Sequence, residues 1–196
     1  MSAAVRTVRP EDVGSLLPSL VALLTDAVDG GASLGFHPPL DPLEAAAYWR
    51  TVATELAAGS RLLVVAEAEG EVVGSGQLVL PSLPNARHRA ELQKLCVLSS
   101  RRGRGIGHAL MDALHEAALR NGRSLILLNT RRSEYPETFY RGLGYTAVGV
   151  VPRYTLARQG ERHDTVILYR DLSSGCADPG ASSGEAVTVA PRRSVR

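Results

Sequence analysis

The chain has 196 residues, of which 44% are hydrophobic and 21% charged, and its formal net charge is +2. Such a chain is long enough to fold as one globular domain with a substantial core, and its small net charge gives no reason to expect a nucleic acid or a membrane as a partner. The two cysteines, Cys96 and Cys176, fall in a predicted strand and in a polar tail. We therefore expect no disulfide between them, and the cytoplasm is the default location.

The first ninety residues alternate helical and strand-like patterns. A short strand at residues 5–9 leads into an apolar-periodic helix through residue 29, which Pro10 and two acidic residues open and in which Pro18 predicts a kink or a restart. The acidic start and the interrupting proline argue against a signal peptide. A loop at 30–39 and a helix at 41–58 follow. Strands at 62–67 and 72–80 then flank a tight turn, which is typical of a hairpin.

The central stretch, residues 91–129, predicts a strand, a glycine-rich turn, a helix and a second strand. From Ile106 onward, apolar residues recur at 106, 110, 113, 114 and 117, the period of a helix, which leaves His108 and His115 largely off the buried stripe. Asn121-Gly122 ends that helix, and the apolar run at 124–128 suits a strand covered on both faces. A unit of this kind forces two parallel strands with a right-handed crossover.

The glycine-rich turn has the composition of an anion site. A helix that begins near Gly105 directs unpaired backbone N–H groups and the positive end of its dipole past the preceding strand. The turn adds three glycines that let oxygens approach the backbone and three arginines, at 101, 102 and 104, so we expect a phosphate group there. The alternative is a tightly packed turn with solvated arginines. The Gly-Lys-Ser/Thr ending of Walker A is missing, and the glycine spacing does not match a dinucleotide fold.

The rest of the chain predicts a short helix at 136–143, strands at 145–151 and 163–169 around a connection at 152–162, and a polar, disordered tail from residue 173. The expected fold class is α/β: a mixed, strongly twisted sheet of about six to seven strands with helices on both faces.

Two ordered motifs resemble those of a known family. Arg102-Gly103-Arg104-Gly105-Ile106-Gly107 matches the Arg/Gln-x-x-Gly-x-Gly/Ala signature of the GCN5-related N-acetyltransferases (GNAT), and residues 138–145 resemble the family's later Phe-Tyr-x-x-x-Gly-Phe/Tyr motif. Within the family, tabtoxin-resistance-type acetyltransferases look most similar. The resemblance implies a GNAT domain over residues 1–172, a tail over 173–196, a final antiparallel hairpin, and a V-shaped gap between the two central parallel strands.

The resemblance also implies acetyl-CoA as cosubstrate and no metal. The pyrophosphate would lie on the Arg102–Gly107 turn and the pantetheine arm along one strand edge. The residues that the resemblance assigns to the cofactor are Leu95, Cys96, Val97, Arg102, Gly103, Arg104, Gly105, Ile106, Gly107, His108, Asn129 and Ser133. Ser133 stands where the family often has an asparagine that contacts pantetheine, and Asn129 is the candidate substitute.

The family reaction is direct attack of an amine on the thioester, so Cys96 need not be a nucleophile. It alternates out of register with Glu91, Gln93, Leu95 and Val97, which favours a buried structural cysteine. An ammonium substrate must lose a proton, and Glu91 is the candidate base, with His88 and His163 as rivals. Tyr140 matches the tyrosine that protonates the departing thiolate. The alternatives are a surface glutamate and a core tyrosine.

The function that follows is transfer of an acetyl group to a primary amine, implied to be a small amino-acid-like or antibiotic-like molecule. Phe36 and Gln93 are candidate substrate contacts, although Phe36 is equally suited to the core. Two alternatives stay open: acetylation of a protein lysine or N-terminus, and a non-catalytic acyl-CoA sensor. We expect a monomer or a homodimer.

Overall fold

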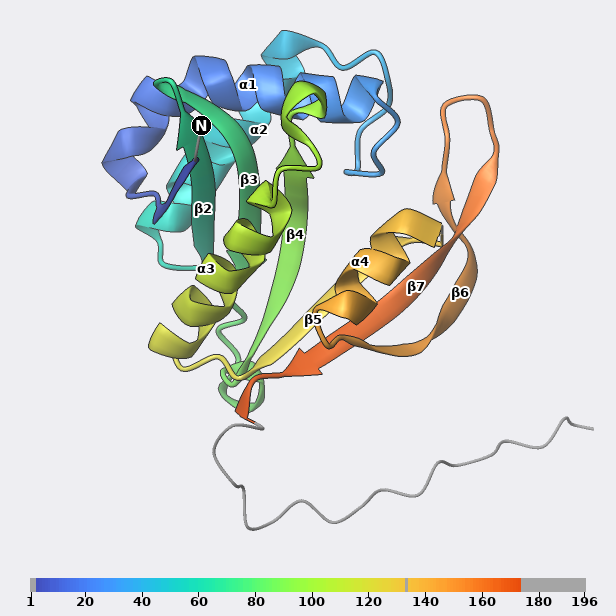
Figure 1. Cartoon of the computed structure of the whole chain (residues 1–196). Coiled ribbons are helices and arrows are strands. Elements are labelled where there is room, and N and C mark those ends of the chain that lie inside the picture. The colour runs from blue at the N-terminus through green and yellow to red at the C-terminus, as the bar shows by residue number, and fades with distance from the viewer. Residues whose placement is uncertain (1–2, 133, 174–196) are drawn as a thin grey trace, which may run out of the picture.

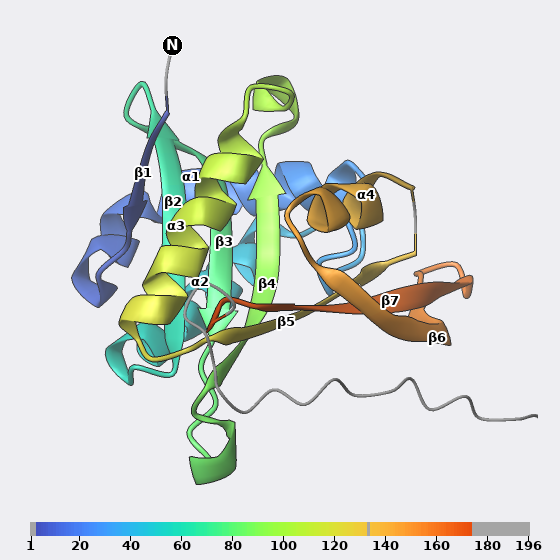
Figure 2. The same cartoon turned by 60° about the horizontal axis from the view of Figure 1, so that its bottom comes forward.

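The computed structural model describes residues 3–132 and 134–173. They form one seven-stranded sheet of order β1-β2-β3-β4-β5-β7-β6 with helices on both faces (Figures 1 and 2). The predicted tail lies outside the described residues from 174 onward, as does Cys176. Among the described residues, no helix is long and apolar enough to cross a membrane. The elements are β1 (Ala4–Thr7), α1 (Val13–Asp29), α2 (Pro42–Ala57), β2 (Arg61–Ala68), β3 (Glu71–Val79), β4 (Arg89–Val97), α3 (Ile106–Arg120), β5 (Leu125–Arg131), α4 (Glu134–Gly142), β6 (Thr146–Leu156) and β7 (Arg162–Asp171).

The two N-terminal helices cover one face of the sheet. A short 3-10 turn, Pro10–Asp12, leads into α1, which contains Pro18 and continues without the restart that the sequence allowed. The α2 helix begins where predicted, because the Asp41 carboxylate accepts the Leu43 N–H at 2.8 Å. Trp49 on α2 is fully buried, and its indole N–H donates to the Leu20 carbonyl on α1 at 3.0 Å. This bond fixes the two helices to each other.

The α3 helix covers the opposite face at very short range (Figures 1 and 2). A Cβ added at Gly76 on β3 would lie 2.6 Å from the Leu114 side chain of α3. The glycine therefore permits the helix to pack directly on the strand. His115, expected to lie largely off the buried stripe, is buried instead, since its ring hydrogen-bonds the Tyr145 hydroxyl at 2.9 Å.

A bulge in β4 corrects the predicted alternation. Gln93 faces Gln77 across the β3–β4 pair and Cys96 faces Ser75, so β4 holds one residue more than β3 between them. Lys94, in this bulge, has a φ of 52°. The extra residue turns the side chains over, so that Leu95 packs in the core under α3 and Cys96 in the core under α1 and α2. Cys96 is buried, as predicted, and burial raises the pKa of its thiol to about 11.

The two central parallel strands separate as the family resemblance implied. They pair only over Arg89–Glu91 and Leu125–Leu127. From there β4 continues to Val97 along β3, while β5 continues to Arg131 along β7. Both views show the strands diverging from this point (Figures 1 and 2), which gives the sheet its V-shaped gap.

The final hairpin is longer than predicted. The connection expected at 152–162 is mostly strand, and the turn between β6 and β7 is only residues 157–161. Pro152 lies in a register shift between Val151 and Thr155, where a missing N–H costs no ladder bond. The Asp164 carboxylate accepts the Arg153 N–H at 3.0 Å within this irregularity.

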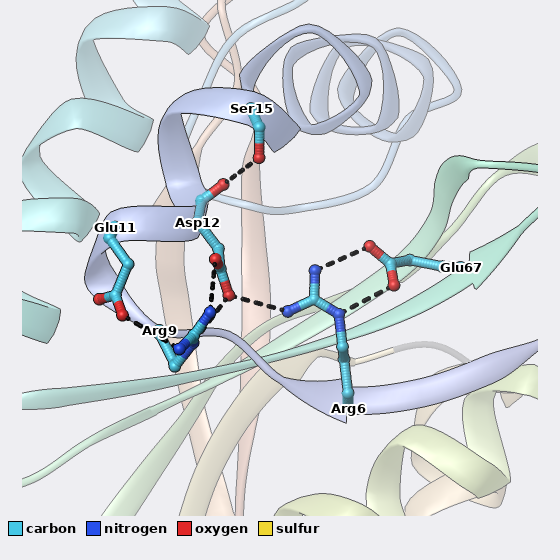
Figure 3. Close-up of polar contacts among 6 residues, drawn as sticks. All are labelled: Arg6, Arg9, Glu11, Asp12, Ser15 and Glu67. Carbon is cyan, nitrogen blue, oxygen red and sulfur yellow. Dashed lines mark hydrogen bonds and ion pairs between the residues drawn. The ribbon is translucent and has the colours of Figure 1, made fainter.

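A group of ion pairs joins β1 to its surroundings (Figure 3). The Arg6 guanidinium donates to both carboxylate oxygens of Glu67 on β2, at 2.9 and 3.0 Å. Its third nitrogen, Nη1, donates to the Asp12 carboxylate at 3.2 Å, and Arg9 also contacts that carboxylate. The short first strand is thus held by side chains as well as by its backbone ladder.

Candidate active site

A cleft of about 960 Å³ opens between the diverging strands, the loop at 31–38 and the end of the β6–β7 hairpin. Glu91 and Gln93 reach it from β4, Asn129 from β5 and Tyr140 from α4. The two residues assigned acid–base roles therefore line the same cavity. Ser133, the other proposed pantetheine contact on this side, lies outside the described residues.

Glu91 stands where β4 and β5 separate. Its Oε1 accepts a hydrogen bond from Gln93 Nε2 at 3.1 Å. Of its two rivals, His163 also lines the cleft and lies 3.9 Å from the Glu161 carboxylate, whereas His88 is not among the lining residues. Glu91 and His163 are thus the two proton acceptors of the cleft that sequence reasoning named.

Tyr140 lines the cleft from α4. Its ring packs edge-on against Phe139 and Tyr145, with centroids 5.3 and 5.7 Å away. Burial raises the pKa of the phenol well above its usual value, so Tyr140 remains a proton donor at neutral pH. It is at once a packed tyrosine and a cleft residue.

The glycine-rich turn is open where a ligand would need it to be. Gly103 and Gly105 have φ values of 72° and 79°, which L side chains rarely adopt, and a Cβ at either would meet nothing within 4 Å. The alternative of a tightly packed turn suits only Gly107, where a Cβ would lie 3.4 Å from the Phe139 ring. Gly105 precedes α3, so the first backbone N–H groups of the helix have no partner within it.

The remaining residues of the turn have different surroundings. Arg102 Nε donates to the Val97 carbonyl at 3.1 Å, and Arg101 pairs with Glu69 at 2.8 Å, while Arg104 is exposed. The Ile106 side chain is buried in the core, so only its backbone is open to a ligand. The His108 ring packs edge-on against Phe139 at 5.1 Å.

Asp26 on α1, which sequence reasoning missed, holds the start of the turn. Its carboxylate accepts the Ser99 N–H at 2.8 Å and the Ser99 hydroxyl at 2.7 Å. The only sequence signal was an acidic residue near the end of an otherwise apolar helix.

Lys94, also missed, anchors the loop over the cleft. Its ammonium donates to the Leu34 carbonyl and lies 5.2 Å from the Phe36 ring centroid and 5.5 Å from that of Tyr48. Burial lowers the pKa of Lys94. Phe36 packs on Tyr48 and also lines the cleft, so both of its predicted roles have a physical basis. Lys94 faces this loop because it lies in the bulge of β4.

The far rim of the cleft is bridged. Arg158, in the turn between β6 and β7, donates to the Pro38 carbonyl at 3.3 Å. The hairpin and the loop at 31–38 therefore meet across the opening. Within residues 3–132 and 134–173, no group of three or more His, Cys, Asp or Glu side chains is placed to hold a metal ion.

Comparison with known proteins shows what this chain is similar to. Residues 59–147 match the family model described as an acetyltransferase (GNAT) domain. N-acetyltransferase family 8 member 2 of Rattus norvegicus is 33% identical over 87 residues, which are 43% of this chain and 38% of that protein. The chain thus aligns with less than half of the length of that relative.

Solved structures share the whole architecture. The ribosomal-protein-alanine N-acetyltransferase of Brucella melitensis superposes with a TM-score of 0.71 at 23% identity, covering 86% of this chain and 99% of that one. A phosphinothricin acetyltransferase of Sinorhizobium meliloti, solved in complex with acetyl-CoA, gives 0.69 at 23% identity over 88% and 89%. At such identities the likeness establishes the fold. Residues 59–147 of the chain therefore resemble an acetyltransferase (GNAT) domain, and the chain has the fold that these structures share.

Proposed function

We propose that the chain moves an acetyl group from acetyl-CoA directly to the primary amine of a small molecule. The observation that carries the proposal is the cleft itself. It brings a carboxylate, Glu91, and a protonated phenol, Tyr140, to the stretch of β4 whose backbone has no partner on the β5 side. The family match over residues 59–147 supports the same reaction.

The residues present fit the cosubstrate. Open space at Gly103 and Gly105, the unpaired N–H groups that begin α3 and the exposed Arg104 suit a pyrophosphate. The free edge of β4 over Leu95–Val97 suits a pantetheine arm, which carries amide groups that pair with backbone. When bound, acetyl-CoA supplies an acyl group activated as a thioester. A backbone N–H near Val97 is the candidate donor to its carbonyl oxygen.

The side chains then have distinct tasks. Glu91 takes a proton from the acceptor ammonium and passes it to solvent, which leaves a nucleophilic amine. The new C–N bond forms as the C–S bond breaks, and the nitrogen gives up its second proton. Tyr140 protonates the departing sulfur and regains a proton from the nitrogen through water, so each turnover releases one proton in total.

The rim of the cleft favours a small acceptor. The Arg158–Pro38 bond crosses the opening that an extended peptide would need. Phe36 and Gln93 remain the candidate acceptor contacts, because both line the cleft. An amino-acid-like or antibiotic-like amine, as the resemblance to tabtoxin-resistance-type enzymes implies, is our proposal for the substrate class. The competing acceptor is a protein lysine or N-terminus.

The test is a thiol-release screen of the full chain with acetyl-CoA over amino acids, aminoglycosides, polyamines and peptides, with calorimetry of acetyl-CoA binding beside it. We expect turnover with a small amine and a loss of about 10²–10⁴-fold in rate for Glu91→Gln at neutral pH. That loss should shrink at higher pH, where solution supplies free amine. Binding without turnover of any amine would support the non-catalytic sensor instead.

A further inference from the structure

A chain of buried and half-buried polar side chains leads to Glu91 from inside the protein. Arg61, at the start of β2, is 8% exposed, and its Nε donates to the Glu55 carboxylate of α2 at 2.5 Å. Its Nη1 donates to Gln77 Oε1 at 2.6 Å and to Gln93 Oε1 at 3.3 Å. Gln93 Nε2 then donates to Glu91 Oε1. The chain runs from α2 to the cleft through Arg61 of β2 and Gln93 of β4, and Gln77 of β3 forms a side branch at Arg61.

The direction of these bonds is set by chemistry. An arginine side chain has only donors, so the amide group of Gln93 must turn its oxygen toward Arg61. Its NH₂ group is thereby directed at Glu91, whose ionised carboxylate only accepts. The Tyr48 hydroxyl adds a further donor to Gln77 Oε1, at 2.8 Å, and holds the other branch. If the Gln93 amide rotated by half a turn, its NH₂ group would face the Arg61 guanidinium, which is also a donor, and its oxygen would face the Glu91 carboxylate.

The hydrogen bond from Gln93 affects how the Glu91 carboxylate is presented to the cleft. The Gln93 bond restrains the Glu91 carboxylate and occupies Oε1, which leaves the second oxygen, Oε2, for the acceptor ammonium. Charges are balanced behind it, because Arg61 is neutralised by Glu55. Restraining a catalytic group by a hydrogen-bonded partner is how a site keeps its geometry between turnovers.

Resting on the proposed function, we infer that Gln93 and Arg61 are positioning residues that orient the Glu91 carboxylate toward the acceptor amine. The bond to Glu91 thus gives Gln93 a positioning role in addition to that of a candidate acceptor contact. A substitution that leaves the Arg61 bond intact but removes the donor to Glu91 should disable the base without disturbing the fold.

Gln93→Glu is that substitution. The new carboxylate has the same shape and accepts from Arg61, but it cannot donate to Glu91 and repels it. We expect kcat to fall about 10–100-fold, within the range of general-base effects, with an unchanged affinity for acetyl-CoA and an unchanged unfolding midpoint. Gln93→Met, which removes both bonds with little change in volume, should lower kcat as well.

The decisive control is the exchanged pair, Glu91→Gln with Gln93→Glu. Once Glu91 is gone there is no base to orient, so Gln93→Glu should cost nothing further, and the double variant should match Glu91→Gln within about twofold. Equal losses from Gln93→Glu with and without Glu91, or a silent Gln93→Glu, would overturn the inference.

A second readout does not depend on turnover. The chain has three glutamines, Gln77, Gln93 and Gln159, so its ¹⁵N spectrum has three glutamine side-chain amide pairs. The pair that disappears in Gln93→Glu should shift in Glu91→Gln, while the Gln159 pair stays in place. Absence of that shift would overturn the inference even in an active enzyme. No turnover by the wild-type chain across the acceptor panel would instead overturn the proposed function and remove the role of Gln93 with it.

Discussion

β4 lies between β3 and β5, and these two strands pair with different lengths of its backbone. β3 pairs with it from Glu91 to Val97, across a single bulge, whereas β5 pairs with it only over Arg89–Glu91. Toward β3 the backbone of β4 is paired along the strand, whereas toward β5 it is unpaired beyond Glu91 and borders the cleft. Changes on the open flank should therefore alter binding and turnover at constant stability, and changes on the closed side should do the reverse.

The largest effect is expected from Gly105→Asp, in the turn that continues from the open flank of β4 to α3. The substitution forces an L residue to a φ of 79° and places a carboxylate among N–H groups proposed to bind phosphate. We expect acetyl-CoA affinity measured by calorimetry to fall about a hundredfold or more, because the helix N-terminus binds anions through those groups. Gly122→Asp is the matched control: it has a φ of 68° and open space, but lies just beyond the other end of α3. Equal affinities in the two variants would contradict the phosphate assignment.

Tyr140→Phe sharpens the comparison with a smaller effect. We expect kcat to fall about tenfold or more through loss of the proton donor to sulfur, while acetyl-CoA affinity and the unfolding midpoint stay nearly constant. Tyr145→Phe is the control, since Tyr145 is not among the residues that line the cleft and its hydroxyl is hydrogen-bonded to His115. That variant should lose stability and keep its turnover. The reverse pattern would assign Tyr140 to the core alone.

The same division separates what the sequence could predict from what it could not. The glycine-rich turn, the helix from Ile106 and the parallel strands follow from local spacing, and the predicted helix agrees closely with α3. The strand predicted at 124–128 exists as β5, but β5 continues to Arg131 because β7 pairs with it along its whole length. The bulge at Lys94 does not, because an extra residue in a strand depends on the partner strand and not on a local pattern. It reversed the expected faces of Leu95 and Cys96.

Long-range polar contacts were equally beyond reach. Gln93 was expected only as a weak substrate contact, since nothing in its neighbourhood points to Arg61, 32 residues away. His115 looked solvent-facing by helical period, yet a tyrosine 30 residues later buries it. In both cases a distant segment supplies the hydrogen-bond partner of a polar residue that is at least half-buried.

His115, which lies away from the cleft, should make the stability of the fold depend on pH. Arg170 donates to its Nδ1 at 3.3 Å, so the neutral ring donates from Nε2 to Tyr145. Burial, and then the charge of Arg170, lower the pKa of His115 to about 4, with Asp112 opposing. The unfolded chain, with a pKa near 6.5, binds more protons between these values, so stability is complete above pH 6.5 and falls as pH decreases toward 4.

Thermal unfolding from pH 7 to pH 4 measures this, since each kcal/mol lost lowers the midpoint of a domain of this size by about 2–4 °C. His115→Gln should start lower at pH 7 but show a shallower decline over that interval, because it has no proton to gain. Parallel curves for the two proteins would show that other groups cause the acid sensitivity. Turnover at pH 7.5, where the ring is neutral, should be similar in both.

The smallest effect is expected from Arg6, on the strand farthest from the cleft. The Arg6 side chain is 40% exposed and Glu67 26% (Figure 3), so solvent screens their two hydrogen bonds. Arg6→Ala should lower the free energy of unfolding by no more than about 1 kcal/mol, as exposed ion pairs do, and the loss should shrink in 1 M salt. Chemical denaturation at two salt concentrations measures both.

Arg61 contains the same group with only 10% of its side chain exposed, although its partner Glu55 is 36% exposed. Arg61→Met leaves the buried Gln77 oxygen without this donor and should lower the free energy of unfolding by about 1–3 kcal/mol, with less dependence on salt than Arg6→Ala. Similar losses in the two variants would mean that burial does not separate the two arginine clusters.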